Sequence, residues 1–83
     1  MMKTKRIGRF ICADPNVCHG QLTFRGTRIL VSDVLELVAA AMNWDDIIEE
    51  CHGSISHRAI AEAIRCAGLA IVRHADEYLK RPV

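Results

Sequence analysis

The chain has 83 residues, of which 51% are hydrophobic, and its formal net charge at pH 7 is +1. This length provides for one hydrophobic core. So short a chain buries only about 60–65% of its unfolded surface, and we therefore expect a partner chain to add stability. The four cysteines form no C-x-x-C pair, and neither a secretory signal nor a membrane-spanning run is evident. These features exclude a disulfide-stabilised secreted domain and a membrane protein, and they predict a cytoplasmic protein with free thiols.

Charge is divided unevenly along the chain. Residues 1–28 contain six lysines or arginines and one acidic residue, whereas residues 29–62 contain seven acidic residues and one arginine. Such asymmetry is typical of proteins that bind a polyanion or an acidic partner near the basic segment. The alternative is that the basic segment neutralises the acidic one, within the chain or in a neighbouring subunit.

Residues 1–30 are predicted to form short strands and turns. Within “FRGTRI”, the pair Gly26-Thr27 separates two short apolar runs, which predicts a hairpin with a two-residue turn. Arg25 and Arg28 would then lie directly opposite each other. Because like charges in that arrangement destabilise a sheet, the two guanidinium groups need an anion nearby.

Three kinds of anion are candidates for this arginine pair. The first is a carboxylate of the same chain, from Asp14, Asp33 or Glu36, the second is a carboxylate of a second subunit, and the third is a nucleic-acid phosphate. Asp33 follows the hairpin closely in the sequence, so we favour a structural bridge. This bridge, from Arg28 to Asp33, would hold the hairpin to the start of the first helix.

Three helices are predicted after the strands. The first follows Ser32 as its N-cap. The second is predicted over residues 43–51, with the asparagine at its first position as N-cap, and Gly53 ends it. The third is capped by Ser56, and its 4-3 apolar spacing predicts a helix that continues to Leu79. The apolar positions are Val31, Val34, Leu35, Val38, Ala41 and Met42 in the first helix and Ile60, Ile64, Ala67, Ile71, His74 and Tyr78 in the third.

This order of elements predicts a single domain over residues 1–83. It would be mainly α-helical with a small N-terminal β-hairpin, the hairpin region covering residues 1–30 and the helical region residues 31–80. The last two helices are joined by a short turn, which is typical of a helix-turn-helix domain. Helical pairs of this kind are common, and most do not bind DNA.

The stretch “ADPNVCHGQLTFRGTRILVSDVLELVAAAMNWDDIIEE” resembles domain-of-unknown-function family 433. Members typically have D-P-x-V-C-G-G-x-P-x-I-R-G-T-R-I-P-V-S, then a leucine-rich helix ending in Ala-Gly-Met and a short acidic helix. The resemblance extends over residues 9–70, and its most specific part is “RGTRI” after “DPNVC”. The chain departs from the pattern at His19, where glycine is usual, and at Leu22 and Leu30, where proline is usual.

The resemblance implies a homeodomain-like helix-turn-helix domain with an N-terminal β-hairpin. Members of the family are commonly described as VapB-type antitoxins, often encoded beside a PIN-like ribonuclease. It therefore implies a DNA-binding antitoxin whose partners would be a PIN-like ribonuclease toxin and duplex DNA.

If the third helix contacts DNA, its exposed first turns supply the contacts. The candidate residues are Ser56, His57, Arg58, Ala61 and Arg65. Arginine pairs with guanine or phosphate, and the helix N-terminus at Ser56 can hold a phosphate through backbone N–H groups. The alternative is a solvated face of ion pairs, in which Glu62 neutralises both Arg58 and Arg65 at helical spacing.

The histidines and cysteines do not predict a metal site. Structural zinc sites use closely spaced cysteine or histidine pairs, and only His52 and His57 meet such spacing, with no cysteine pair beside them. No activated nucleophile and no isolated carboxylate pair is evident, so we expect neither an enzyme nor a cofactor. Trp44 is expected to close the core, although an aromatic residue at that position could also bind a partner.

Together these features predict a homodimeric, DNA-binding, antitoxin-like protein of a toxin–antitoxin pair. The alternative is a non-catalytic dimeric module for protein–protein interaction. In both cases the small core and the long apolar stripe of the third helix predict a second copy of the chain.

Overall fold

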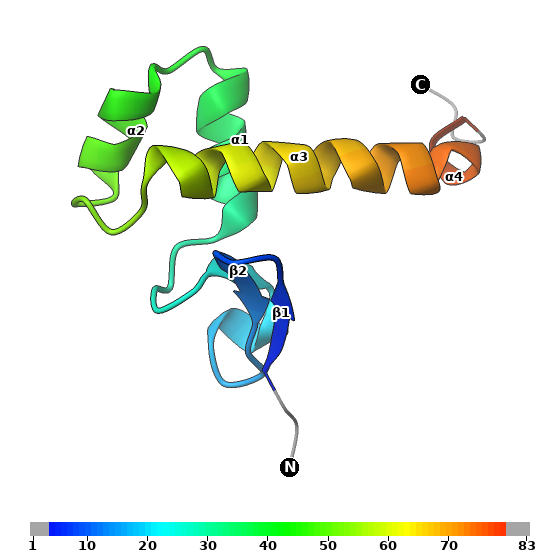
Figure 1. Cartoon of the computed structure of the whole chain (residues 1–83), viewed down its shortest axis with the longest axis horizontal. Helices are drawn as coiled ribbons and strands as arrows, with labels where there is room; N and C mark the ends of the chain where they lie inside the picture. Colours follow the sequence, from blue (N-terminus) through cyan, green and yellow to red (C-terminus); the bar gives the residue numbers. More distant parts are fainter. Residues whose placement is uncertain (1–3, 80–83) are drawn as a thin grey trace.

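A three-stranded antiparallel sheet packs against helices in the computed structural model, which describes residues 4–79 apart from the side chain of Tyr78 (Figure 1). The elements in chain order are β1 (Lys5–Ile7), β2 (Ile11–Ala13), the 3-10 turn η1 (Cys18–Gly20), β3 (Leu22–Phe24), α1 (Val31–Ala39), α2 (Trp44–Glu50), α3 (His57–Arg73) and α4 (Ala75–Leu79). The three main helices and the small N-terminal sheet confirm the fold class predicted from the sequence.

The sheet has one strand more than expected. β2 is its central strand and pairs with β1, where Ile11 lies opposite Ile7, and with β3, where Ile11 lies opposite Phe24. The second half of the predicted hairpin is reduced to one isolated bridge between Thr23 and Leu30. β1 was missed because three exposed residues carry no buried face from which a strand period could be recognised.

The turn in “FRGTRI” lies one residue earlier than predicted. The Thr27 N–H donates to the Phe24 carbonyl at 3.0 Å, and Gly26 between them has φ +78°. A turn with positive φ at its third residue favours glycine there, so Arg25 and Gly26 form its centre. Arg25 and Arg28 are both exposed loop residues and do not form the cross-strand pair that the sequence predicted.

The N-terminal boundary of α1 also differs from the prediction. Leu30, not Ser32, is its N-cap residue, and it provides no side-chain hydrogen bond. The helix ends at Ala39, and the left-handed conformation of Ala41, with φ +63°, separates Met42 from it. The apolar spacing that placed Met42 on the helical face therefore continued past the end of the helix.

The predictions for α2 and for the start of α3 are confirmed. Asn43 caps α2, because its side-chain oxygen accepts from the N–H groups of Asp45 at 2.9 Å and Asp46 at 3.2 Å. Gly53 has φ +72° just beyond the helix. Ser56 caps α3 by accepting from the Ala59 N–H at 3.2 Å. These caps satisfy backbone donors within four residues of themselves, which is why the local sequence was sufficient to predict them.

One hydrophobic core joins the sheet to the three main helices. The buried residues that form it are Ile11, Phe24, Val31, Val34, Ile47, Ile55, Ala59, Ile60 and Ala63. Trp44 is half-buried and packs against this core, which confirms the prediction that it closes the core. In α3, the residues of this core all belong to the first half of the helix.

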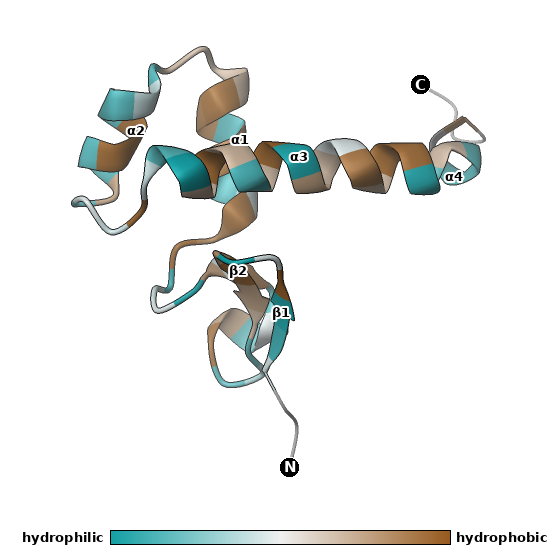
Figure 2. Ribbon diagram, in the orientation of Figure 1, coloured by the Kyte–Doolittle hydropathy of each residue, from teal (hydrophilic) through white to brown (hydrophobic). Residues whose placement is uncertain are grey.

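The second half of α3 extends beyond the rest of the domain (Figure 1). We call residues 67–73 the α3 arm. Much of this segment is hydrophobic (Figure 2). Its large apolar side chains are mostly exposed, with 56% of Leu69, 55% of Ile71 and 74% of Val72 accessible. The prediction of one continuous helix to Leu79 was wrong, because α3 ends at Arg73 and α4 follows as a separate short helix. Within residues 4–79, no helix is long and apolar enough to cross a membrane.

Candidate nucleic-acid interface

The start of α3 is fixed by apolar packing on both sides of its N-cap. Ile55 precedes Ser56 and Ile60 follows it, and both isoleucines are buried in the core. A hydrophobic pair around a capping residue sets the angle at which the chain enters the helix. The exposed side chains of the first turn, His57 and Arg58, are therefore held at a defined place on the surface.

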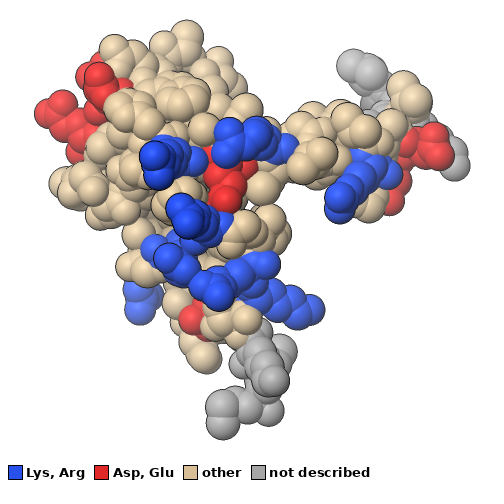
Figure 3. All heavy atoms as spheres, viewed as in Figure 1, with Lys and Arg blue, Asp and Glu red and all other residues tan. Residues whose placement is uncertain are grey.

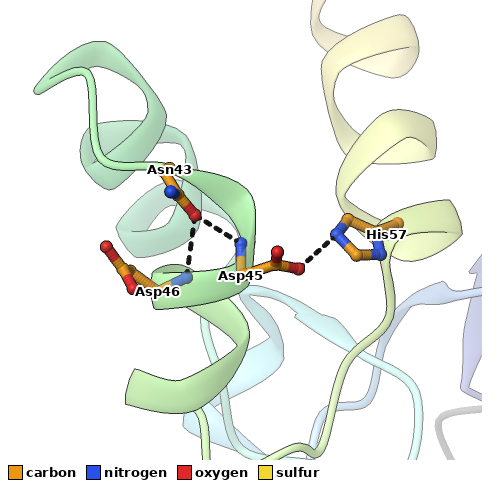
Figure 4. Close-up of polar contacts among 4 residues, drawn as sticks. All are labelled: Asn43, Asp45, Asp46 and His57. Atoms are coloured by element: carbon orange, nitrogen blue, oxygen red, sulfur yellow. Dashed lines mark hydrogen bonds and ion pairs between the residues drawn. The ribbon is translucent and has the colours of Figure 1, made fainter.

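His57 is engaged with the start of α2 (Figure 4). Its Nε2 lies 2.8 Å from the Asp45 Oδ1, and its ring stacks on Trp44 with a centroid separation of 6.1 Å and an interplanar angle of 26°. The side chain thus joins the N-terminal ends of α2 and α3. Among the predicted contact residues, the side chains of His57 and of the N-cap Ser56 have partners within residues 4–79.

Glu62 links α3 to the turn between β1 and β2. One carboxylate oxygen accepts from the Arg9 N–H at 2.8 Å, and the other accepts from the Phe10 N–H at 2.7 Å. A carboxylate that accepts two backbone N–H bonds is a strong anchor, because the acceptor is charged. Glu62 is half-buried, and these two hydrogen bonds hold the β1–β2 turn of the sheet against α3.

Gly8 makes room for this anchor. Its φ of +64° is a conformation that residues with a Cβ rarely adopt, and a Cβ at this position would overlap the Glu62 carboxylate. Neither the requirement for Gly8 nor the role of Glu62 was predicted from the sequence. The two residues are more than fifty positions apart, so no local pattern connects them.

The ion-pair network proposed for α3 does not form. Within residues 4–79, the ion pairs are His57 with Asp45 and His74 with Glu77. Glu62 binds the backbone of the turn, and neither Arg58 nor Arg65 pairs with it. Both arginines are exposed on the stripe of α3 that contains Glu62, since they lie four residues before it and three after it.

Two arginines of the sheet lie beside this stripe. Arg9 is in the turn that Glu62 holds, and the Arg25 N–H donates to the Phe10 carbonyl at 2.7 Å, next to Arg9. We call the four exposed arginines Arg9, Arg25, Arg58 and Arg65 the basic surface. Figure 3 shows lysine and arginine side chains gathered over the sheet and the first half of α3, with the acidic side chains of α2 at the edge of the view.

A shallow pocket lies at the end of the basic surface nearest the N-terminus of α3. Its volume is about 220 Å³. Its lining residues include Arg25, the N-cap Ser56, and Ser54 of the loop that precedes α3. Ala61, another predicted contact residue, is half-buried and lies next to Glu62. The structure therefore brings Arg25, Ser56, Arg58 and Arg65 to one side of the molecule.

The predicted bridge from Arg28 to Asp33 is absent. In the part of the chain that the structure describes, Arg28 forms no ion pair with Asp14, Asp33 or Glu36. The loop is fastened instead by Thr27, whose hydroxyl donates to the Phe24 carbonyl at 2.8 Å and accepts from the Ile29 N–H at 3.0 Å. Uncharged hydrogen bonds hold the hairpin, so its arginines remain accessible to another anion.

Arg28 lies apart from the basic surface. It lines a second pocket of about 310 Å³ together with Asp14 and Thr23. Its carbonyl accepts a weak hydrogen bond from the Cys18 thiol at 3.5 Å. The two arginines that the sequence placed in one site therefore belong to two different sites.

The cysteines and histidines do not assemble into a metal centre within residues 4–79, where no group of three or more potential ligands is found. All four cysteines are free. Burial raises the pKa of the Cys51 thiol, and the neighbouring Glu50 carboxylate raises it further. This thiol is therefore neutral at physiological pH and a poor nucleophile.

Comparison with known proteins gives one match. Residues 11–67, which are more than half of the chain, match the model of a family described as proteins of unknown function, DUF433. Neither a curated protein nor a solved structure matches the chain. The matched segment contains the loop of residues 25–28, α1, α2 and the first half of α3, and the chain belongs to the DUF433 family.

Proposed function

We propose that this protein is a DNA-binding, antitoxin-like member of a toxin–antitoxin pair, and that its basic surface contacts the duplex. The observation that supports this most is the position of Glu62. Its carboxylate is bound to the backbone of the β1–β2 turn, and within residues 4–79 it forms no ion pair with Arg58 or Arg65, so both guanidinium groups remain available to another anion. The same contact brings Arg9 beside them.

The four arginines divide into two kinds of contact. Arg58 and Arg65 lie two helical turns apart on one stripe of α3, the arrangement from which a recognition helix contacts base edges in the major groove. Arg9 and Arg25 lie on the sheet beside that helix, where they suit phosphate binding. Guanidinium groups bind phosphate and guanine in a bidentate manner, which favours arginine over lysine for both tasks.

The acidic residues restrict the orientation of the duplex. α2 has Asp45 and Asp46 in its first turn and Glu49 and Glu50 at its end, all of them exposed. These carboxylates would repel DNA phosphates. The duplex must then lie on the sheet side of α3, with α2 turned away from it, and His57, which is paired with Asp45, would be at the edge of the contact.

The toxin in such a pair would be a PIN-like ribonuclease, the partner that the family resemblance implies. An antitoxin of this kind binds its toxin as well as its operator. Co-expression with the product of the neighbouring gene and purification of the complex tests this part of the proposal directly.

The DNA contact is tested by mobility shift with the DNA upstream of the protein's own gene and with random duplex, at two salt concentrations. Arg58→Ala or Arg65→Ala should cost about 1–3 kcal/mol of binding free energy if the lost contact is to a base. A lost phosphate contact should instead reduce the slope of affinity against salt by about one. Arg73→Ala is the matched control, because Arg73 is an exposed arginine at the opposite end of α3.

Circular dichroism must first show that each variant is folded. A wild-type protein that does not prefer its own upstream DNA over random duplex, alone or with the neighbouring gene product, would contradict the proposal. The alternative function would then be a non-catalytic module for protein–protein interaction, and the exposed apolar α3 arm is the observation that favours it.

A further inference from the structure

The sheet has a second buried face, turned away from the helical core. Ile11 and Phe24 pack in the core, and because successive side chains of a strand point to opposite faces, their neighbours Cys12 and Thr23 point away from it. Both are nevertheless buried, with 6% of Cys12 and 1% of Thr23 accessible. Both also line the pocket of about 310 Å³ to which Arg28 belongs. This pocket therefore lies on the far face of the sheet.

Two segments form the walls of this pocket. The first is the turn that begins at Asp14, whose Oδ1 accepts from the Asn16 N–H at 2.9 Å. The second is the loop of residues 25–28. The Cys18 thiol, which follows the first segment, donates to the Arg28 carbonyl in the second at 3.5 Å. These contacts fasten the walls through backbone groups and one carboxylate oxygen, and they do not involve the guanidinium group of Arg28.

The backbone next to the pocket is strained. Cys18 and His19 have φ values of +50° and +59°, in the left-handed region that residues with a Cβ rarely adopt. They directly follow Val17, which lines the pocket. Strained backbone of this kind persists only where the surrounding structure holds it, and it is concentrated at functional sites. The conformation of this segment therefore marks the pocket as a candidate binding site.

The polar groups of the pocket carry opposite charges. Asp14 and Arg28 both line it, yet within residues 4–79 they form no ion pair with each other. The buried Thr23 hydroxyl can donate one hydrogen bond and accept two, and its contact with the Cys12 sulfur at 3.8 Å is weak. Buried hydroxyl groups usually have a stronger partner. The pocket therefore offers a ligand one positive group, one negative group and one hydroxyl.

We propose that this pocket binds a free α-amino acid with a small side chain, its carboxylate on Arg28 and its ammonium group on Asp14. A guanidinium group binds a carboxylate in a bidentate manner, and an ionised aspartate accepts hydrogen bonds from an ammonium group. A phosphate or another simple anion would be repelled by Asp14, whereas a zwitterion satisfies both charges. The volume is at the lower end of the range of about 300–1,000 Å³ for small-molecule sites, and Cys12 and Val17 supply apolar surface for a short side chain.

This site does not depend on the proposed function. Arg28 lies apart from the basic surface, and the amino acid would occupy the far face of the sheet.

The inference is tested by isothermal titration calorimetry of the full-length protein with glycine, L-alanine, L-serine, L-threonine and L-valine at millimolar concentration. We expect at least one of them to bind. Its N-acetyl derivative, which lacks the ammonium group, and its amide, which lacks the carboxylate, should each bind about tenfold more weakly or worse, because each loses one charged hydrogen-bonding group.

Arg28→Ala and Asp14→Asn should each raise the dissociation constant by about tenfold or more for the same reason. Asp14→Asn keeps an oxygen that can accept from the Asn16 N–H, so the turn is preserved. The matched control is Arg25→Ala, which removes an exposed arginine from the same loop but from a different pocket and should leave the affinity unchanged.

Arg28 is exposed, so Arg28→Ala should keep the helical content of wild type by circular dichroism. The inference is overturned if none of the five amino acids binds to wild type. It is equally overturned if the N-acetyl derivative binds as tightly as the free amino acid, since the pocket would then be a site for simple anions. An affinity that Arg28→Ala leaves unchanged would place the amino acid elsewhere and also contradict the inference.

Discussion

In the first half of α3, Ala59, Ile60 and Ala63 lie in the core, whereas Ile71 and Val72 in the α3 arm are more than half exposed. The apolar stripe that includes Ile60 continues to Ile71 with helical spacing, and from its length the sequence predicted a longer helix and a second copy of the chain. The difference arises because the sheet, α1 and α2 contact only part of the helix. Hydrophobic spacing thus specifies a face of a helix, and it does not specify whether the same chain covers that face.

The polar contacts of the two halves differ in the same way. The first half contains Glu62, which binds two backbone N–H groups of the β1–β2 turn. Just beyond the second half, the ring nitrogen of His74 and the carboxylate of Glu77 in α4 are 3.5 Å apart and exposed. Contacts between distant segments fix the first half in the fold, whereas the contact at the other end joins neighbours in the sequence.

The largest expected effect comes from removing the same side chain in the two halves. Ile60 is fully buried, so Ile60→Ala should lower the free energy of unfolding by about 2–5 kcal/mol through lost burial and the resulting cavity. Ile71→Ala should change it by no more than about 0.5 kcal/mol, because 55% of that side chain is exposed. Urea denaturation measures both. Equal losses would mean that the two halves are equally buried, contrary to the structure.

A smaller effect is expected at the Glu62 anchor. Glu62→Ala leaves the Arg9 and Phe10 N–H groups without their acceptor and should cost about 1–3 kcal/mol of stability. Glu36→Ala is the control, since Glu36 is an exposed glutamate of α1, and its effect should stay within about 0.5 kcal/mol.

The dependence of this anchor on Gly8 can be measured by a double-mutant cycle. Gly8→Ala should destabilise wild type more than it destabilises the Glu62→Ala variant, because its Cβ overlaps the carboxylate only when Glu62 is present. Strictly additive losses would show that the glycine is needed only for its positive φ.

The smallest effect is expected for the contact between His57 and Asp45, which joins the N-terminal ends of α3 and α2. His57 and Asp45 are both exposed, so their coupling free energy should be about 0–1 kcal/mol in a double-mutant cycle with alanine at each position. Trp44→Ala should cost more than His57→Ala, because Trp44 packs against the core as well as on the histidine ring. A coupling well above this range would make the pair a major anchor of the first half of α3.

Part of the candidate site could be predicted from the sequence because it depends on neighbouring residues. Arg58 and Arg65 were identified from their spacing on a helix, and the N-cap of that helix from Ser56. The acidic residue between the arginines was also recognised, but its partner was not. Helical spacing favoured ion pairs within α3, whereas the carboxylate found two backbone donors on a turn more than fifty residues earlier.

The loop of residues 25–28 was the other incomplete prediction. The sequence indicated a turn at Gly26, and the positive φ of this residue confirms it. It did not indicate that Arg25 and Arg28 would lie in separate pockets. The pairing register is the predicted one, since Thr23 lies opposite Leu30, but the turn is centred on Arg25 and Gly26. A shift of one residue in the turn was enough to separate them.

The sequence by itself determined the caps at Asn43 and Ser56, the turn glycines and the apolar helical faces, since each of these depends on interactions within about four residues. Tertiary structure alone decided that β1 joins the sheet, that Glu62 binds the β1–β2 turn, and that the α3 arm lies outside the core. These outcomes depend on which distant segments meet, and the free energy of such contacts comes from surfaces that only the folded chain brings together.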